Sequence, residues 1–540
     1  MASPRRFCFD PFSMIEKFIN GLAVAAVCSS VLVLALGLAA CGTLPPQQDR
    51  PVSQALAPSG DRPLVRIARA SAPEPASSAF RLMPLGLYSL DARIELIRRA
   101  QSSLDVQYYL IQDDRSGRLF MRSLRDAALR GVRVRLLVDD LNTSGADPLF
   151  AGLAAFPNTE VRLFNPFCCA RESLTSRFAA SLADFRRLNH RMHNKLFIAD
   201  GAIAVMGGRN IADEYFARGV ASNFVDMDVL VVGNVVDRLA GIFDAYWNSP
   251  QAYPVSSIVA ASADDPRGRF NHLVDEGDQM TFVAVPPMDM LAQRPLGAEL
   301  DAGRLALATG KAVAFADQPG KVMATSAEMA RSMSVQMNVM DRVALAGRRV
   351  VLSSPYFVPG SMGVRTFAEL RERGVDVVIL TNSFAANDVP ITHIGYARYR
   401  AGLVRAGVEL YELSPAGIER ETWDSIRGLS RGRLHAKVAV IDDSMVYIGS
   451  MNLDPRSEST NTELGIIAQC PELARDVSRV IDATRLQRSY RLRFGADGES
   501  LEWVVMGDPG EQVLASEPGV GAFAQLRNML LAPLVPELFL

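Results

Sequence analysis

Metal-ligand and disulfide patterns are both missing from this sequence of 540 residues. Its few cysteines include no CxxC pair, and no group of His, Asp or Glu residues has the spacing of a metal site. A chain of this length can bury a large apolar core, so it does not need a disulfide scaffold. We therefore expect no metal and no other cofactor. Three cysteines are expected to be small buried side chains: Cys168, Cys169 and Cys470.

An excess of positive charge is missing as well. The formal net charge is −2 and the sequence pI is about 6.3. Non-specific binding of nucleic acid depends on a basic surface, so this balance argues against a nuclease. We expect no nucleic-acid partner. A negatively charged substrate would have to be bound by a local group of cations.

Charge is absent altogether from residues 21–41, which are almost wholly apolar and follow a basic segment. This order is typical of an export signal. The apolar run ends in Leu38-Ala39-Ala40-Cys41, which resembles the lipobox of bacterial lipoproteins, where the cysteine is lipidated. We interpret residues 1–41 as a signal peptide with Cys41 as the lipidation site.

The residue after the lipobox bears on where the protein is anchored. Gly42 stands where an aspartate would favour the inner membrane, so the resemblance favours an outer-membrane anchor on the periplasmic face. The alternative is an uncleaved N-terminal helix, because the apolar run is just long enough to span a bilayer. Both interpretations place the body of the protein in the cell envelope, outside the cytoplasm. Met14 offers a second start site.

The rest of the chain reads as a duplication of one α/β plan. In each copy a helical pattern ends at a glycine, Gly131 or Gly374, and a strand pattern follows. Strands that alternate with helices indicate an α/β fold with a mixed or mostly parallel sheet in each copy. The expected parts are a flexible Pro/Ala/Ser tether over 42–79, a first domain over 80–250, an inter-domain insertion over 251–330, a second domain over 331–515 and an apolar C-terminal tail over 516–540.

A sequence motif occurs once in each copy at an equivalent place. The first occurrence is His193-Asn194-Lys195, Asp200, Gly207 and Asn210; the second is His435-Ala436-Lys437, Asp442, Gly449 and Asn452. Both satisfy H-x-K-x4-D-x6-G-x2-N without a gap, which is a specific signal. The motif resembles the HKD motif of the phospholipase D superfamily. The resemblance implies two α/β sandwich domains, related by duplication, that pack around one shared active site.

The residue types of the motif suit the transfer of a phosphodiester. Lys195 and Lys437 can neutralise the phosphate oxygens, and Asn210 and Asn452 can donate hydrogen bonds to them. An imidazole can attack phosphorus when neutral and donate a proton when charged. By analogy with the superfamily, we assign His193 as the nucleophile that forms a phosphohistidine, and His435 as the general acid and base.

The other predicted site residues support the histidines or the turns. A carboxylate that binds the far nitrogen of a histidine fixes its tautomer, and we expect Asp228 and Glu463 to do this, since each opens an apolar strand. The superfamily resemblance also implies that Asp200, Asp442, Gly207 and Gly449 are structural members of the motif.

Several longer runs resemble bacterial cardiolipin synthases, above all their C branch. Examples are Leu104-Asp105-Val106-Gln107-Tyr108-Tyr109 and Gly449-Ser450-Met451-Asn452-Leu453-Asp454. The resemblance implies a phosphatidyltransferase that acts on phospholipids at a membrane surface, and it leaves an accessory protein open. The alternatives are a phospholipase D that hydrolyses phospholipids to phosphatidic acid, a periplasmic nuclease, and an inactive membrane-tethered scaffold.

Overall fold

The computed structural model describes residues 44–46, 50–72, 77–181, 184–259, 265–276, 285–324, 326–415, 431–506, 510 and 512–521. The expected signal peptide with Cys41, and the part of the expected tail beyond residue 521, lie outside these residues. In the described part, no helix is both long enough and apolar enough to cross a membrane.

The first half of the chain builds a mixed sheet in the order β9-β4-β3-β2-β5-β6-β8-β1. The pairs β2–β3 and β3–β4 are parallel, as the alternation of strands and helices predicts, and the remaining pairs are antiparallel. The strands are β1 (Ser78–Met83), β2 (Ser103–Tyr108), β3 (Arg133–Asp139), β4 (Thr159–Phe164), β5 (Leu196–Ala199), β6 (Ile203–Gly207), β8 (Asp228–Gly233) and β9 (Ala252–Pro254).

The second half repeats this order as β18-β13-β12-β11-β15-β16-β17-β10. The parallel pairs are β11–β12 and β12–β13, at the equivalent places. The strands are β10 (Ala308–Ala316), β11 (Arg349–Ser353), β12 (Asp376–Asn382), β13 (Glu409–Leu413), β15 (Val438–Ile441), β16 (Met445–Gly449), β17 (Leu464–Gln469) and β18 (Ser489–Phe494), followed by β19 (Leu501–Val505) and β20 (Val513–Leu514). The predicted α/β duplication is confirmed.

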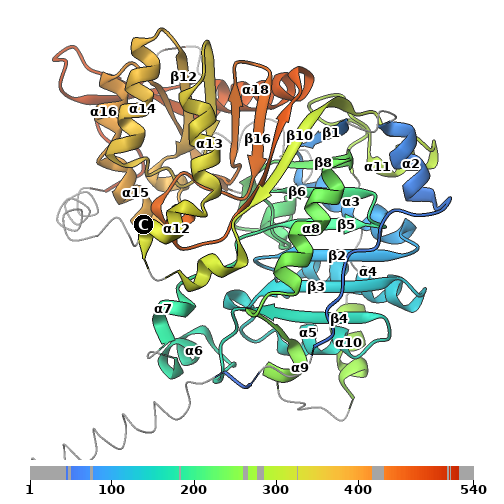
Figure 1. The fold of residues 1–540 in the computed structure, drawn as a ribbon. Helices are drawn as coiled ribbons and strands as arrows, with labels where there is room; N and C mark the ends of the chain where they lie inside the picture. Colours follow the sequence, from blue (N-terminus) through green and yellow to red (C-terminus); the bar gives the residue numbers. More distant parts are fainter. Residues whose placement is uncertain are drawn as a thin grey trace, which may run out of the picture.

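The two half-sheets join edge to edge through β1 and β10, which pair antiparallel. Figure 1 shows β10 running between the two halves. Helices α8 (Val235–Trp247) and α18 (Pro471–Gln487) follow equivalent strands, and both contribute to one apolar cluster that contains strand residues from the two halves. The halves therefore share a core, and the site-bearing strands of one half cannot move independently of the other.

The other helices surround this core or cap the ends of the strands. Those of the first half are α2 (Pro63–Ser71), α3 (Gly86–Arg99), α4 (Arg115–Leu129), α5 (Asp147–Ala154), α6 (Leu174–Ala180), α7 (Phe185–Leu188), α9 (Val255–Ile258) and α10 (Pro266–Asp275). Those that follow are α11 (Leu296–Asp301), α12 (Ala327–Ser332), α13 (Val335–Ala344), α14 (Gly360–Glu372), α15 (Pro390–Ala397), α16 (Arg400–Arg405) and α17 (Pro455–Ser459). Short 3-10 turns are η1 (Asp140–Asn142), η3 (Asp213–Phe216), η4 (Pro319–Met323) and η5 (Phe384–Ala386).

Three predicted segment assignments need correction. Residues 50–72 of the expected tether lie against the first domain, where α2 buries Leu64, Val65 and Ile67. The high proline content hid the amphipathic spacing of these residues, which is what lets the helix pack. The expected insertion over 251–330 contains β10, a full member of the second sheet. The expected C-terminal tail also begins in contact with the body, because Glu517 pairs with Arg400 at 2.8 Å.

The motif aspartates hold equivalent turns in the two halves. Asp200, at the end of β5, accepts hydrogen bonds from the backbone N–H groups of Gln101, Ser102 and Ser103. Asp442 accepts the same set from residues 347, 348 and 349. Each aspartate has a positive φ, near 50°, in a tight turn where a short polar side chain is tolerated. These bonds fix the strand that follows each His-x-Lys segment.

Candidate active site

Each of the two motif histidines binds a carboxylate that belongs to the other half of the chain. His193 Nδ1 lies 3.0 Å from Glu463 Oε2, and His435 Nδ1 lies 2.6 Å from Asp226 Oδ2. Each histidine therefore belongs to one half and its carboxylate to the other. A carboxylate on Nδ1 leaves Nε2 of the neutral ring as the basic nitrogen, which is the form that attack on phosphorus requires.

Backbone hydrogen bonds also connect the two halves at both histidines. The N–H of His193 donates to the carbonyl of Thr462 at 2.9 Å, and the N–H of His435 donates to that of Val225 at 2.7 Å. Two short strands from opposite halves, β7 (Ser222–Val225) and β14 (Arg431–Leu434), pair in parallel just before His435. Neither half holds a complete site alone.

The two lysines are buried cations with spare hydrogen-bond donors. Lys195 Nζ donates to the carbonyl of His193 at 2.7 Å, and Lys437 Nζ donates to that of His435 at 2.6 Å. Both side chains are about 1% exposed, and no carboxylate of the described residues forms an ion pair with either. An ammonium group has three donors, so each lysine keeps two for the oxygens of a phosphate.

Burial and mutual repulsion shift the titration of these groups. Burial lowers the pKa of Lys195 to about 7 and that of Lys437 to about 8. Lys437 also lowers the pKa of Lys195, and both lysines lower the pKa values of the two histidines. Burial and the two lysines hold the pKa of His193 well below its usual value, and burial with Lys437 lowers that of His435. Without a bound substrate both imidazoles are therefore neutral at neutral pH, which is the form that a nucleophile or a base requires.

The two carboxylates differ in charge. Burial raises the pKa of Glu463 to about 7. Burial opposes ionisation of Asp226 too, but His435 and Lys437 outweigh it and hold its pKa below the usual value. Glu463 also accepts hydrogen bonds from the hydroxyls of Ser450 and Ser457. The His435 side thus carries a fixed negative charge, and the His193 side carries a carboxyl group that titrates near neutrality.

Aromatic rings lie against both histidines, and the sequence reasoning did not single them out. The ring of Tyr109 lies 5.0 Å from that of His193, while Tyr215 and Phe224 lie 5.1 Å and 4.9 Å from His435. Asn210, a predicted phosphate ligand, donates to the hydroxyl of Tyr215 at 2.9 Å. These rings fix the imidazole planes from the side and keep water away from them.

The prediction that Asp228 binds a histidine is wrong. The structure places Asp226 against His435 instead. Asp228 is occupied by a buried ion pair with Arg93 at 3.0 Å and by the hydroxyl of Ser89. Its side chain also lies against Gly207, where an added Cβ would come within 2.4 Å of Asp228 Oδ1. Asp228 thus binds the first domain to helix α3 and has no free oxygen to orient a histidine.

Strand register shows why the sequence pointed to the wrong aspartate. In the second half Gly449 pairs with Gly465, so Glu463 lies two residues before the partner of the motif glycine. In the first half Gly207 pairs with Asp228, and two residues before it stands Asp226. Glu463 is therefore equivalent to Asp226. Counting two residues back from the strand partner of the motif glycine identifies Asp226. Taking the first acidic residue of the apolar strand gives Asp228, two residues too far along the chain.

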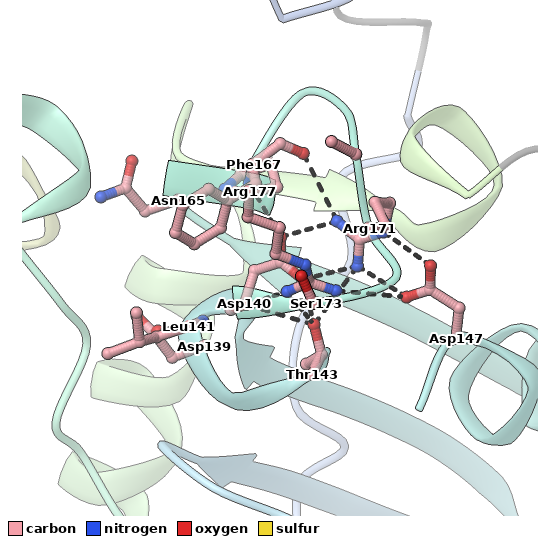
Figure 2. A network of polar contacts seen from close by, with 12 residues as sticks. Asp139, Asp140, Leu141, Thr143, Asp147, Asn165, Phe167, Arg171, Ser173 and Arg177 are labelled. Atoms are coloured by element: carbon pink, nitrogen blue, oxygen red, sulfur yellow. Dashed lines mark hydrogen bonds and ion pairs between the residues drawn. The ribbon is translucent and has the colours of Figure 1, made fainter. Parts of the chain in front are cut away.

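A network of charged groups at the end of β3 supports the His193 segment from behind. Asp139 accepts the backbone N–H of Met192 at 2.8 Å and pairs with Arg191 at 3.3 Å. The next residue, Asp140, takes the guanidinium of Arg171 at 2.7 Å, and Arg171 also reaches Asp147 (Figure 2). This network fixes the backbone immediately before His193.

Family comparison covers both halves of the chain. A family model described as "Cardiolipin synthase, PLD-like domain" matches residues 93–247 and 339–485. A protein named cardiolipin synthase C, from Escherichia coli, is 38% identical over 84% of this chain and 95% of its own length. An uncharacterized protein of Helicobacter pylori is 31% identical over 77% of this chain and 81% of its own. Cardiolipin synthase A of Pseudomonas fluorescens is 26% identical over 76% and 68%.

A solved structure supports the fold. Phosphatidylserine synthase of Haemophilus influenzae superposes with a TM-score of 0.54 and 14% identity, over 85% of this chain and 95% of that protein. At this identity the likeness shows the arrangement of the two halves and nothing about the substrate.

The assignment of Asp226 predicts different defects for two neighbouring aspartates. Asp226→Asn should lower turnover by roughly 10³-fold with little loss of stability, because it removes only the group that orients His435. Asp228→Asn should cost roughly 3–5 kcal/mol of unfolding free energy, because it leaves Arg93 buried without its partner. Steady-state rates and thermal melting measure the two effects. If Asp228→Asn loses activity while keeping its melting temperature, the assignment is wrong.

The lysine pKa values predict a basic limb in the pH profile. Lys195 and Lys437 are charged below about 7 and about 8, and the general acid His435 must also hold a proton, so kcat/KM should fall as pH rises toward and through this window. A bound phosphate favours the charged lysines, so the limb in kcat should lie at higher pH. On the acid side, activity should fall only below the usual histidine range, since protonation removes the nucleophile. A kcat/KM that is flat up to pH 9 would contradict charged lysines as the phosphate ligands.

Proposed function

This chain belongs to the cardiolipin synthase family with phospholipase D-like domains, and from that premise we propose that it joins two phospholipids into cardiolipin. Family membership makes it a phosphatidyltransferase of the phospholipase D type with phospholipid substrates. What remains a proposal is the identity of the product, the role of each site residue and the place where the enzyme is anchored.

The observation that carries the proposal is the reciprocal exchange of carboxylates. His193 and His435 each have Nδ1 bound to a carboxylate of the other half, at 3.0 Å and 2.6 Å. Each therefore presents Nε2 for chemistry, and the two lysines supply positive charge beside them. Two imidazoles and two ammonium groups suffice for a two-step displacement at a phosphodiester, with a covalent intermediate between the steps.

In the first step His193 Nε2 attacks the phosphorus of the donor lipid. An N–P bond forms, the P–O bond to the headgroup breaks, and His435 donates its proton to the leaving alkoxide. The negative charge of the bound phosphodiester, together with Asp226, raises the pKa of His435, so that this histidine carries the proton that it donates in this step. Lys195 and Lys437 hold the phosphate oxygens, and Asn210 and Asn452 add neutral donors in this proposal.

In the second step His435, now neutral, takes the proton from the hydroxyl of the acceptor lipid. That oxygen attacks phosphorus, the N–P bond breaks, and His193 is regenerated. Water can replace the acceptor and would give phosphatidic acid. A positioned acceptor can still win, because well-oriented groups reach effective molarities of roughly 10⁵–10⁸ M.

We also propose that Cys41 carries a lipid that anchors the enzyme at the outer membrane, facing the periplasm. The supports are the uncharged apolar run over 21–41, the lipobox-like Leu38-Ala39-Ala40-Cys41 and Gly42 after it. An anchor of this kind keeps the site among lipid acceptors at high local density, which favours transfer over hydrolysis.

Purified enzyme on vesicles that contain phosphatidylglycerol should yield cardiolipin as the main product, with phosphatidic acid minor, as resolved by mass spectrometry. Added ethanol should divert part of the product to phosphatidylethanol, which reports the covalent intermediate. His193→Ala and His435→Ala should each lower turnover by at least roughly 10³-fold, because both steps are required. If phosphatidic acid dominates at every phosphatidylglycerol content, the chain is a hydrolase; if only DNA is cut, it is a nuclease.

The anchor is tested separately. Cys41→Ser should leave the protein unlipidated, so that labelled fatty acid is no longer incorporated and the precursor migrates more slowly. Cys28→Ser, inside the same apolar run, is the matched control and should be processed normally. Unchanged processing and membrane fractionation of Cys41→Ser would favour the uncleaved helix.

A further inference from the structure

A position-by-position comparison of the two halves concerns one arginine. In the first half it is paired with a carboxylate, and over the described residues its counterpart in the second half is not. Asp200 and Asp442 are equivalent, and the strand pairs beside them, Leu104–Ala199 and Val350–Ile441, match in register. The next strands, β3 and β12, pair in parallel with β2 and β11 in the same register. Leu137 of β3 is therefore equivalent to Leu380 of β12. Asp139 of the first half therefore corresponds to Asn382 of the second.

The hydrogen bond at this position is kept, but the charge is lost. Asp139 accepts the N–H of Met192 at 2.8 Å, and Asn382 accepts the N–H of the equivalent Leu434 at 2.8 Å. The adjacent Asp140, which holds two arginines in the network of Figure 2, corresponds to the neutral Ser383. The second half therefore keeps the backbone contact and has none of the negative charge behind it.

The arginine that this carboxylate would neutralise is still present. Arg191, two residues before His193, is fully buried and pairs with Asp139. Its counterpart, Arg433, stands two residues before His435 and is half-buried. Over the described residues, no carboxylate oxygen lies within the 4.0 Å ion-pair distance of Arg433. A cation that loses its structural partner and becomes accessible is free to bind an anion from solution or from a ligand.

Arg433 lies beside the aromatic contacts of His435. On β14 it pairs with Phe224 of β7, whose ring is 4.9 Å from His435. Arg433 also acts on the carboxyl group of Glu214, beside Tyr215: burial raises the pKa of Glu214, Arg433 lowers it and Asp388 raises it. In the proposed mechanism this is the side from which the acceptor hydroxyl approaches, opposite the bond to His193.

We propose that Arg433 forms a subsite for the phosphate that the acceptor lipid itself carries. This rests on the proposed function, in which the acceptor is an anionic phospholipid and the product contains two phosphates joined through glycerol. The first phosphate occupies Lys195 and Lys437, and the second lies one headgroup away, at Arg433. A guanidinium binds phosphate through two parallel hydrogen bonds, so the subsite would select a phospholipid acceptor over water or a simple alcohol.

The test is the partition of one intermediate between two acceptors. Phosphatidylglycerol vesicles with added ethanol yield cardiolipin and phosphatidylethanol from the same phosphatidyl-enzyme, so their ratio does not depend on how fast that intermediate forms. Arg433→Ala should lower the ratio of cardiolipin to phosphatidylethanol by roughly tenfold, the effect of losing one charge-assisted contact. Arg433→Lys should recover part of it, since a point charge remains without the bidentate geometry.

Two further variants serve as controls. Glu214→Gln removes the nearby carboxylate and should leave the ratio unchanged or raise it, while Arg493→Ala, an exposed arginine on β18 paired with Glu502, should leave it unchanged. Arg433→Gln keeps a polar side chain and replaces Arg433→Ala if that variant fails to fold. An unchanged ratio in the folded Arg433 variants overturns the subsite. Absence of cardiolipin with the unsubstituted enzyme overturns the proposed function instead.

Discussion

The hydrogen bonds from each histidine to a carboxylate of the other half are the constraint on which this structure depends. Glu463 must reach His193, and Asp226 must reach His435, across the junction of two sheets. These two hydrogen bonds form only if the two halves are held in one fixed spatial relation. The pairing of β1 with β10, the crossing of β7 with β14 and the shared core of α8 and α18 supply this relation. The extensive interface between the halves is thus a requirement of the chemistry.

Electrostatics at the site follow from the same burial. Four groups that prefer charge in water, two lysines and two carboxylates, lie within a few per cent of complete burial. Their mutual attraction does not satisfy them fully, since each lysine ammonium is bonded to one backbone carbonyl and, within the part of the chain that the structure describes, to no carboxylate. The lysine ammonium groups therefore keep unused hydrogen-bond donors in the free site, and the oxygens of a bound phosphate would accept from them. Binding energy of this kind is available at the phosphorus, where charge develops in the transition state.

Much of this could be predicted from the sequence, because the two motifs fix residue types at fixed spacing. The histidines, the lysines and the turn aspartates were all identifiable in this way, as was the α/β duplication. Glu463 was found from its place at the start of an apolar strand, the signal that failed for Asp228. Asp226 was not, because its place depends on the pairing of β6 with β8, which a single sequence does not show. The aromatic residues Tyr109, Tyr215 and Phe224 come from three separate segments that only the fold brings to the histidines. Helix α2 was missed because a proline-rich segment looked too polar to pack.

Duplication explains why a symmetric motif can run an asymmetric reaction. Each half supplies the same His-x-Lys segment, yet the surroundings differ: Glu463 is bound by two serine hydroxyls, whereas Asp226 is not. Behind the first segment lie Asp139 and Asp140, and behind the second lie Asn382 and Ser383. The first segment is therefore held by a buried ionic network, which in the proposed mechanism suits a histidine that returns to one position after each covalent cycle. The second is held by neutral groups beside a half-buried arginine, which in that mechanism suits the side where two different alcohols leave and enter.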